Sequence, residues 1–296
     1  MTLIPPKNTP QSWSLAHKSF YQLVKLILPR VIRRYFRFEV NNIEFIQNLP
    51  EGVPVIYCFN HRSHLDTFLF ASALVYPFGN RTACGLMTSG KAMEEKSFGL
   101  LRYLGAFPVY SKNPKPALEY VNKLLNENLA VLIAPQGKRI PSNPIEDYHN
   151  LVKSAKSGVG RVILNFNGKV PVVPIYIHGS QEALNQGNII PKMKSFISVS
   201  FCKPILFVKY KREEGWSDSD PDFYFTAHTI SEEIMNSIRD QMLFQERYIF
   251  QIVSQLSNTY IEDLRLAPDT HPNTYKLISR LSQYSPEELE KFVSIR

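Results

Sequence analysis

The sequence predicts an α/β domain in which a mostly buried sheet is flanked by helices, with an amphipathic helix before it and a helical extension after it. Three observations support this fold class. The chain has 296 residues, of which 44% are hydrophobic, which is enough for one large core. Short apolar runs alternate with segments of helical spacing, a pattern typical of layered α/β folds. Basic residues concentrate near the N-terminus, which sets that segment apart from the rest.

The predicted domain occupies residues 41–210. The apolar runs that predict its strands are Val53 to Phe59, Thr82 to Met87, Ala106 to Tyr110, Leu129 to Pro135, Val170 to Ile177 and Phe196 to Phe201. The segments with helical spacing between them are Asp66 to Val75, Lys91 to Tyr103, Pro116 to Asn126 and Leu151 to Phe166. The strands are apolar throughout, as expected for a sheet covered on both faces.

Residues 1–40 carry seven basic residues and one acidic residue, so they hold +6 of the formal net charge of +8. On a helix over residues 18–35, one face would carry Lys18, Gln22, Lys25, Pro29 and Arg33, and the opposite face Phe20, Val24, Ile27, Val31 and Tyr35. Such a helix can lie in the headgroup region of an anionic membrane. It can equally pack its apolar stripe on the protein's own core, and the sequence leaves both alternatives open.

The segment 211–296 is predicted to be a helical extension whose role the sequence does not define. It begins with KREEGWSDSDPD, a charged and turn-rich stretch that suits a linker or surface loop. A long helical pattern follows from about Ser231 to Tyr260. Further on, Ser285 and Glu288 have capping-box spacing around Pro286 at the first helical position.

Several classes of protein are not favoured by the composition. Every apolar run is interrupted within about a dozen residues, so we expect no membrane-spanning helix, and no secretory signal is recognisable. Cys58, Cys84 and Cys202 are far apart and are expected to be reduced core residues of a protein that faces the cytosol. Nucleic-acid binding is not expected, because the positive charge lies in an amphipathic helix and no base-reading module accompanies it.

The stretch CFNHRSHLDTF, residues 58–68, is the strongest candidate for a catalytic site. His61 and Asp66 are five residues apart, which would place them about 140° apart on one regular helix. They can meet if the strand ends at Phe59 and Asp66 begins the next helix, where its charge is also favoured by the helix N-terminus. A histidine oriented by a carboxylate is a general base suited to removing a proton from a hydroxyl group. A structural histidine at a helix cap is the alternative.

Two other motifs are less convincing. HRSHLD is superficially similar to the HxHxDH metal site, but its histidines are three residues apart and Thr67 replaces the last histidine, so no metal is expected. GLMTSGK, residues 85–91, fits the GxxxxGK phosphate loop. However, Ala92 stands where that loop needs Ser or Thr for magnesium, so we treat the match at Lys91 as coincidental.

Four blocks in the chain resemble those of the glycerolipid acyltransferase superfamily, which includes the 1-acylglycerol-3-phosphate acyltransferases. The blocks are His61-x4-Asp66 preceded by Asn60, GKAMEEKSFGLLRYLGAFPVYS at 90–111, APQGKR at 134–139 and VPVVPIYIHGS at 170–180. Their order and their spread over about residues 50–210 make the resemblance far more specific than any one block. The resemblance implies a layered acyltransferase-type domain and does not cover residues after 211.

The chain departs from the family in the second and third blocks. Gln136 stands where the family has Glu, Lys138 where it has Thr, and Ser111, followed by Lys112, where it commonly has Arg. The family's third block is thought to bind the glycerol phosphate acceptor. The resemblance therefore implies substrate binding by Asn60, Lys91, Lys112, Gln136, Gly137, Lys138 and Arg139. Adjacent cations after a glycine turn also suit an anion site, although a solvated basic turn is the alternative.

The resemblance implies direct acyl transfer. His61, held by Asp66, would deprotonate the acceptor hydroxyl, which attacks the thioester of acyl-CoA or acyl carrier protein; no further cofactor is implied. His64 is expected to be only a neighbouring polar residue. The acceptor would be a glycerol-phosphate-type lipid such as lysophosphatidic acid, and the expected location is the cytoplasmic face of a membrane, in peripheral or monotopic contact with phospholipids. The alternative is a catalytically altered lipid-binding or scaffold protein on the same fold. Acyl chain length and oligomeric state are not predicted.

Overall fold

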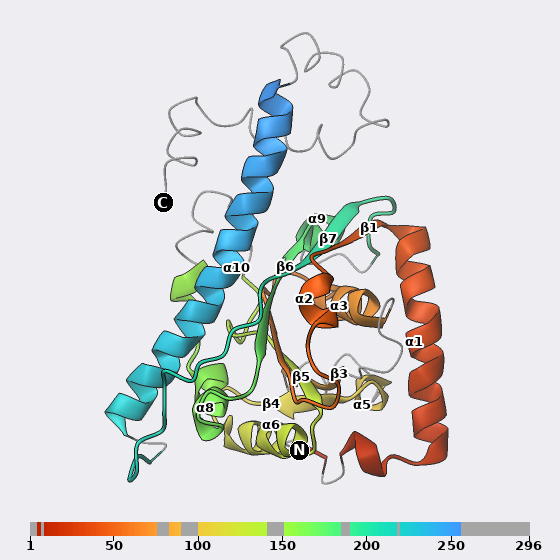
Figure 1. Cartoon of the computed structure of the whole chain (residues 1–296). Helices are drawn as coiled ribbons and strands as arrows, with labels where there is room; N and C mark the ends of the chain where they lie inside the picture. Colours follow the sequence, from red (N-terminus) through yellow and green to blue (C-terminus); the bar gives the residue numbers. More distant parts are fainter. Residues whose placement is uncertain are drawn as a thin grey trace.

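The computed structural model describes residues 5–6, 9–75, 83–89, 100–140, 151–184, 190–217 and 220–255. Within these ranges the chain forms a seven-stranded sheet with helices on both faces (Figure 1). The strands are β1 (Arg37–Asn41), β2 (Ile56–Phe59), β3 (Ala83–Ser89), β4 (Ala106–Val109), β5 (Ala130–Ile133), β6 (Val172–His178) and β7 (Phe196–Phe201). The helices are η1 (Pro10–Ser12), α1 (Leu15–Tyr35), α2 (Glu44–Gln47), α3 (Asp66–Val75), α5 (Leu100–Tyr103), α6 (Lys115–Asn126), α8 (Gly158–Asn165), α9 (Ser180–Ala183) and α10 (Pro221–Gln255).

The strand order is β1-β7-β6-β2-β5-β3-β4. From β6 to β4 all neighbouring strands are parallel. β7 is antiparallel to β6 but parallel to β1, so these two strands run opposite to the other five. β2 therefore lies between β5 and β6, and the carboxyl ends of these three strands meet at one edge of the sheet.

Alternating side chains of the central strands fill two separate cores, which makes the domain a three-layer α/β/α sandwich. Ile56 and Cys58 point toward the face that α6, α8 and α10 cover. Tyr57 and Phe59 point toward the opposite face, against α1, α2 and α3. The two-residue period of a strand explains this division. The predicted α/β class with a buried sheet is thereby confirmed.

α10 begins about ten residues earlier than the helix predicted from Ser231, and its first half belongs to the main core. One face of this helix is fully buried against α8 and β6; it consists of Phe223, Ala227, Ile230, Ile234, Met235, Ile238 and Met242. In Figure 1 the helix crosses the molecule over α8 and continues beyond the sheet. Residues 221–242 of the predicted helical extension therefore pack in the same core as α6 and α8. Ser285, Pro286 and Glu288 lie outside the described residues.

α1 forms as predicted but is oriented differently. Lys25 and Pro29, which were expected on its exposed basic face, are buried, and Ile32 joins the core. Ile27 and Val31, from the face expected to pack or insert, are exposed together with Leu23 and Leu26. The helix wheel was misleading because the buried stripe lies between the two predicted faces, where α1 contacts α3.

The segment from Leu151 to Phe166, predicted as one helix, is broken. A helical turn at 151–153 is followed by an irregular stretch at 154–157, and α8 starts only at Gly158. In the part of the chain that the structure describes, no helix combines the length and the apolar character that crossing a membrane would require.

Candidate active site

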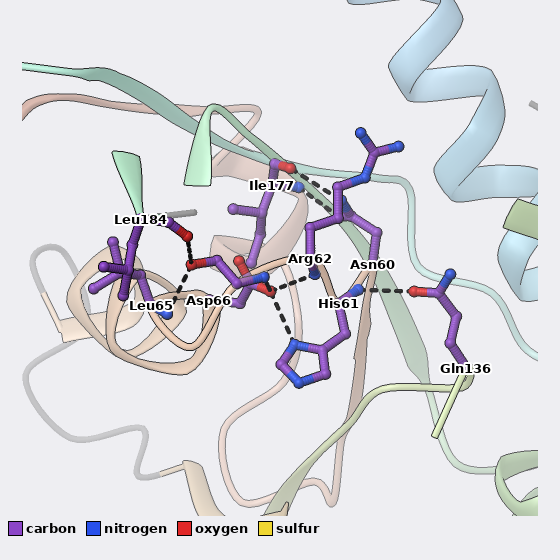
Figure 2. A network of polar contacts seen from close by, with 9 residues as sticks. Asn60, His61, Arg62, Leu65, Asp66, Gln136, Ile177 and Leu184 are labelled. Carbon is purple, nitrogen blue, oxygen red and sulfur yellow. Dashed lines mark hydrogen bonds and ion pairs between the residues drawn. The ribbon is translucent and has the colours of Figure 1, made fainter. Parts of the chain in front are cut away.

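The candidate site lies at the carboxyl ends of β2, β5 and β6. β2 leads into the His61 turn, β5 into the loop that contains Gln136, and β6 into the Gly179 turn at the start of α9. Ligand sites of parallel α/β sheets characteristically form at this edge, because the loops that follow neighbouring strands converge there. Figure 2 shows the polar contacts that link the first two loops and β6.

His61 and Asp66 meet at the turn between β2 and α3. The imidazole Nδ1 lies 2.9 Å from Asp66 Oδ2. Asp66 is the first residue of α3, and the intervening residues fold the carboxylate back onto the ring, so the predicted contact is confirmed. A carboxylate accepts hydrogen bonds, which assigns the hydrogen to Nδ1 and leaves the lone pair on Nε2. The imidazole can therefore accept a proton at Nε2, and 24% of its side-chain surface is exposed.

The Asp66 carboxylate also organises the turn itself. Its Oδ2 accepts the backbone N–H groups of Arg62 and Ser63 at 2.7 and 2.8 Å, in addition to His61 Nδ1. The side chain is completely buried, and its second oxygen, Oδ1, has no hydrogen-bond partner among the described residues. Three donors on one oxygen define both the position of the carboxylate and the path of the loop, so the histidine and its orienting partner form one rigid unit.

Asn60, expected to bind substrate, is fully buried and bonded to the protein at both ends of its amide. Its Nδ2 donates to the carbonyl of Ile177 at 3.0 Å, and its Oδ1 accepts the Ile177 N–H at 2.7 Å (Figure 2). Asn60 thus continues the pairing of β2 with β6 beyond the last strand residue. Its side chain does not reach into open space where a substrate could contact it.

Gln136 has a similar arrangement. Only 1% of the residue is exposed, and its Oε1 accepts the backbone N–H of His61 at 2.8 Å. Its Nε2 donates to Ser154 Oγ at 3.0 Å. Gln136 therefore contacts the backbone of His61 from inside the protein, and both polar atoms of its amide bond to other protein groups.

The rest of the third block forms the loop beside His61. Gly137 adopts φ +66°, and its N–H donates to Ala134 O at 3.0 Å in a tight turn. Ile140 N–H donates to His61 O at 3.0 Å, which keeps Lys138 and Arg139 next to the histidine turn. Lys138 is exposed and Arg139 is half-buried. The positive φ explains the glycine, because residues with a Cβ rarely adopt this conformation.

The structure does not bring the remaining two predicted lysines to this site. Lys112 lies in the turn after β4, at the edge of the sheet, and no described contact connects it with His61. Lys91 lies outside the described residues, as do the rest of residues 90–99, which form the first part of the second block, and the end of the GxxxxGK motif.

Two further residues contact the third-block loop, Ser154 and Lys156, and neither belongs to a recognisable motif in the sequence. Lys156 N–H donates to Pro135 O at 2.9 Å, and Lys156 Cγ lies 3.6 Å from where a Cβ on Gly137 would be. Both residues lie in the break before α8, which the sequence pattern did not reveal. Lys156 adds an exposed cation beside Lys138 and Arg139.

The described cysteine thiols are not placed for nucleophilic chemistry. Cys58 is fully buried inside β2, and burial raises the pKa of its thiol well above the usual range. Burial likewise raises the pKa of the Cys202 thiol to about 12. Both thiols therefore stay protonated near neutral pH, whereas the thiolate is the reactive form. Within the described ranges, no group of three His, Cys, Asp or Glu residues could hold a metal ion.

Comparison with known proteins agrees with the site. Residues 38–178 match the sequence family described as Acyltransferase. This range contains the His61 turn, the Gln136 loop and β6, which are the three parts that meet in the structure. The family match over residues 38–178 confirms the superfamily resemblance found in the sequence.

Among solved structures, the chain is similar to the crystal structure of the 1-acyl-sn-glycerophosphate (LPA) acyltransferase PlsC from Thermotoga maritima. The identity is 17% and the TM-score 0.49, and the alignment covers 77% of this chain and 81% of that one. This likeness is too low to transfer a substrate. A search among curated proteins found no significant match.

Proposed function

We propose that the protein transfers a fatty acyl group from an acyl thioester to the hydroxyl group of a glycerol-phosphate-type lipid such as lysophosphatidic acid. The acyl donor would be acyl-CoA or acyl carrier protein. The observation that supports this most directly is the 2.9 Å contact between His61 Nδ1 and Asp66 Oδ2, in a turn that leaves the imidazole partly exposed. The family match of residues 38–178 supplies the reaction class.

In this proposal the chemistry needs one general base and no covalent enzyme intermediate. His61 Nε2 accepts the proton of the acceptor hydroxyl, whose oxygen attacks the thioester carbon. The tetrahedral intermediate then collapses, the C–S bond breaks, and the imidazolium returns its proton to the departing thiolate. Asp66 holds the ring in one tautomer and stabilises the imidazolium by its charge.

The phosphate of the acceptor would bind at the loop after β5. Lys138 and Arg139 lie beside the His61 turn, and the exposed Lys156 flanks the same glycine. These cations beside the His61 turn would bind the phosphate of the acceptor and hold its hydroxyl group near His61 Nε2. Asn60 and Gln136 do not bind substrate in this proposal, because protein partners occupy both ends of each amide. Substrate binding by Lys91 and Lys112 stays a prediction.

A lipid acceptor gives the exposed side of α1 a role in peripheral membrane contact. Leu23, Leu26, Ile27 and Val31 are each about half exposed, and Arg30, Arg33 and Arg34 lie exposed among them. Apolar side chains interspersed with cations suit the headgroup region of an anionic bilayer. The opposite side of α1 packs on α3, so the helix would lie along the membrane surface as part of the domain.

The test is consumption of palmitoyl-CoA by the purified protein in the presence of lysophosphatidic acid, with the lipid product identified by mass spectrometry. We expect turnover in the unmodified protein and a loss of at least a hundredfold in His61→Ala. His64→Ala is the matched control, since His64 lies exposed in the same turn, and its turnover should stay within about twofold.

Loss of turnover in His64→Ala but not in His61→Ala would overturn the assignment of the base. Folded protein that binds lysolipid vesicles yet turns over neither lysophospholipids nor glycerol phosphate, with either donor type, would favour the non-catalytic alternative.

A further inference from the structure

We propose that Gln136 is a positioning residue for His61, and that Ser154 acts through Gln136 as its anchor. This inference rests on the proposed function of His61 as the general base. It assigns a role to the residue that departs most clearly from the family pattern, where Glu is usual.

The backbone of His61 is held on both sides by the loop after β5. Gln136 Oε1 accepts the His61 N–H at 2.8 Å, and Ile140 N–H donates to the His61 carbonyl at 3.0 Å. The imidazole is held separately, by Asp66 at Nδ1. Main chain and ring are thus fixed by different elements, and together they determine where Nε2 lies relative to a substrate.

The orientation of the Gln136 amide follows from its partners. A backbone N–H can only donate, so the atom that faces His61 must be the oxygen, and the NH₂ group must face Ser154. Ser154 Oγ donates its own hydrogen to Leu151 O at 2.7 Å. It therefore offers only a lone pair to residue 136, and it requires a donor there.

This chain of bonds explains why an amide suits the position. In a Gln136→Glu variant, an ionised carboxylate would accept the His61 N–H, but it would also present a second acceptor to the Ser154 oxygen and leave that contact unpaired. Because the site is buried, a carboxylate oxygen without a hydrogen-bond donor would lower the stability of the folded protein. Glutamine therefore supplies the donor that Ser154 requires once the Ser154 hydroxyl is bonded to Leu151 O. The change from Glu to Gln is thus compatible with retained catalysis.

The experiment compares Gln136→Ala, Ser154→Ala and the double variant, with the exposed Gln47→Ala as control. In Gln136→Ala we expect kcat to fall about tenfold to a hundredfold while KM for both substrates stays within about twofold, because the base is displaced and no substrate contact is removed. In Ser154→Ala the fall in kcat should be smaller. The kcat of the double variant should equal that of Gln136→Ala, since Ser154 acts only through Gln136.

A second readout does not depend on turnover. The Nδ1 hydrogen of His61, shared with Asp66, should give a downfield proton resonance that His61→Ala removes and thereby identifies. We expect this resonance to be broadened or lost in Gln136→Ala and kept in Gln47→Ala. Absence of turnover in every protein would contradict the proposed function, while this resonance would still report whether Gln136 positions His61.

Two results would overturn the inference. A raised KM with unchanged kcat would make Gln136 a substrate contact, and unchanged kcat together with an unchanged resonance would make it purely structural. If Gln136→Ala does not fold, Ser154→Ala, which removes a single hydroxyl, is judged by the same two readouts.

Discussion

Gly160 of α8 lies so close to Ala227 of α10 that a Cβ on Gly160 would be 1.8 Å from the Ala227 carbonyl oxygen. The Ser231 hydroxyl joins the same contact: it accepts the Gly160 N–H at 3.2 Å and donates to Ala227 O at 3.0 Å. Two helices that approach at backbone distance cannot separate without exposing the core between them. This contact shows most directly that α10 is part of the domain.

Gly160→Ala should therefore destabilise the protein by about 3 kcal/mol or more, since the added methyl group must push α10 away from α8. Urea unfolding monitored by circular dichroism measures the change. Gly158→Ala is the matched control on the same helix: its Cβ would be 3.9 Å from Leu118 Cδ2, an ordinary contact, so its effect should lie within about 1 kcal/mol of zero. Equal stability of the two variants would contradict the close packing of α10.

Asp66→Asn should lower kcat by about a hundredfold to ten-thousandfold, because the amide lacks the charge that stabilises the imidazolium. Asp66→Ala should in addition reduce the free energy of unfolding by about 2–4 kcal/mol, as the N–H groups of Arg62 and Ser63 lose their acceptor. Steady-state kinetics and urea titration separate the two effects. The exposed Asp240→Asn should change neither quantity appreciably. Full activity of Asp66→Asn would argue against a catalytic pair.

Replacing Leu23 and Leu26 together by Glu should weaken binding to vesicles of anionic phospholipid by at least tenfold, because two apolar anchors are lost and two negative charges are added. Vesicle co-sedimentation measures the affinity. Phe225→Glu is the control, since Phe225 is 72% exposed but lies on α10. Point substitutions are preferable to removing residues 1–38, because Ile32 and Phe36 belong to the core. Equal vesicle binding by all three proteins would exclude α1 as the contact surface.

Cys58 and Cys202 should not react with a thiol reagent at pH 8 in the folded protein, whereas both should react in urea. Using a Cys84→Ser background limits the readout to these two residues. Burial raises the thiol pKa of each, so the folded state keeps both protons while the unfolded state loses them above about pH 9. Stability should therefore fall as pH rises through that value, and less so in Cys58→Ala. Rapid labelling of the native protein would contradict the burial.

Local features of the fold were predictable from sequence, and non-local ones were not. The helix predicted at Asp66 to Val75 and the strand at Phe196 to Phe201 have the observed bounds. β1 was missed because RFEVN mixes charged and apolar residues, as befits an edge strand that is only partly buried. Strand order and the reversed direction of β7 depend on pairing between distant segments, which periodicity does not encode.

Within the candidate active site, too, contacts between residues close in the sequence were predictable and contacts between distant residues were not. The His61–Asp66 contact spans five residues and follows from one strand-to-helix turn. The contact between His61 and Gln136 joins residues 75 positions apart. It requires β2 and β5 to be neighbours, which the sequence does not encode locally, so the family resemblance implied a substrate-binding role for Gln136 where the structure shows an internal hydrogen bond. Ser154 gave no signal, because its role depends on the break before α8.

The pairing of β1 with β7 bears on how the chain folds during synthesis. Within the described sheet β1 pairs with β7 alone, and Arg37 of the first strand faces Phe196 of the other, far along the chain. When the first strand leaves the ribosome, its partner has not yet been translated, and the α10 residues that cover the other core come later still. The nascent domain must therefore keep apolar surface exposed until most of the chain is made. A chaperone that shields these apolar faces during synthesis should therefore raise the yield of folded protein.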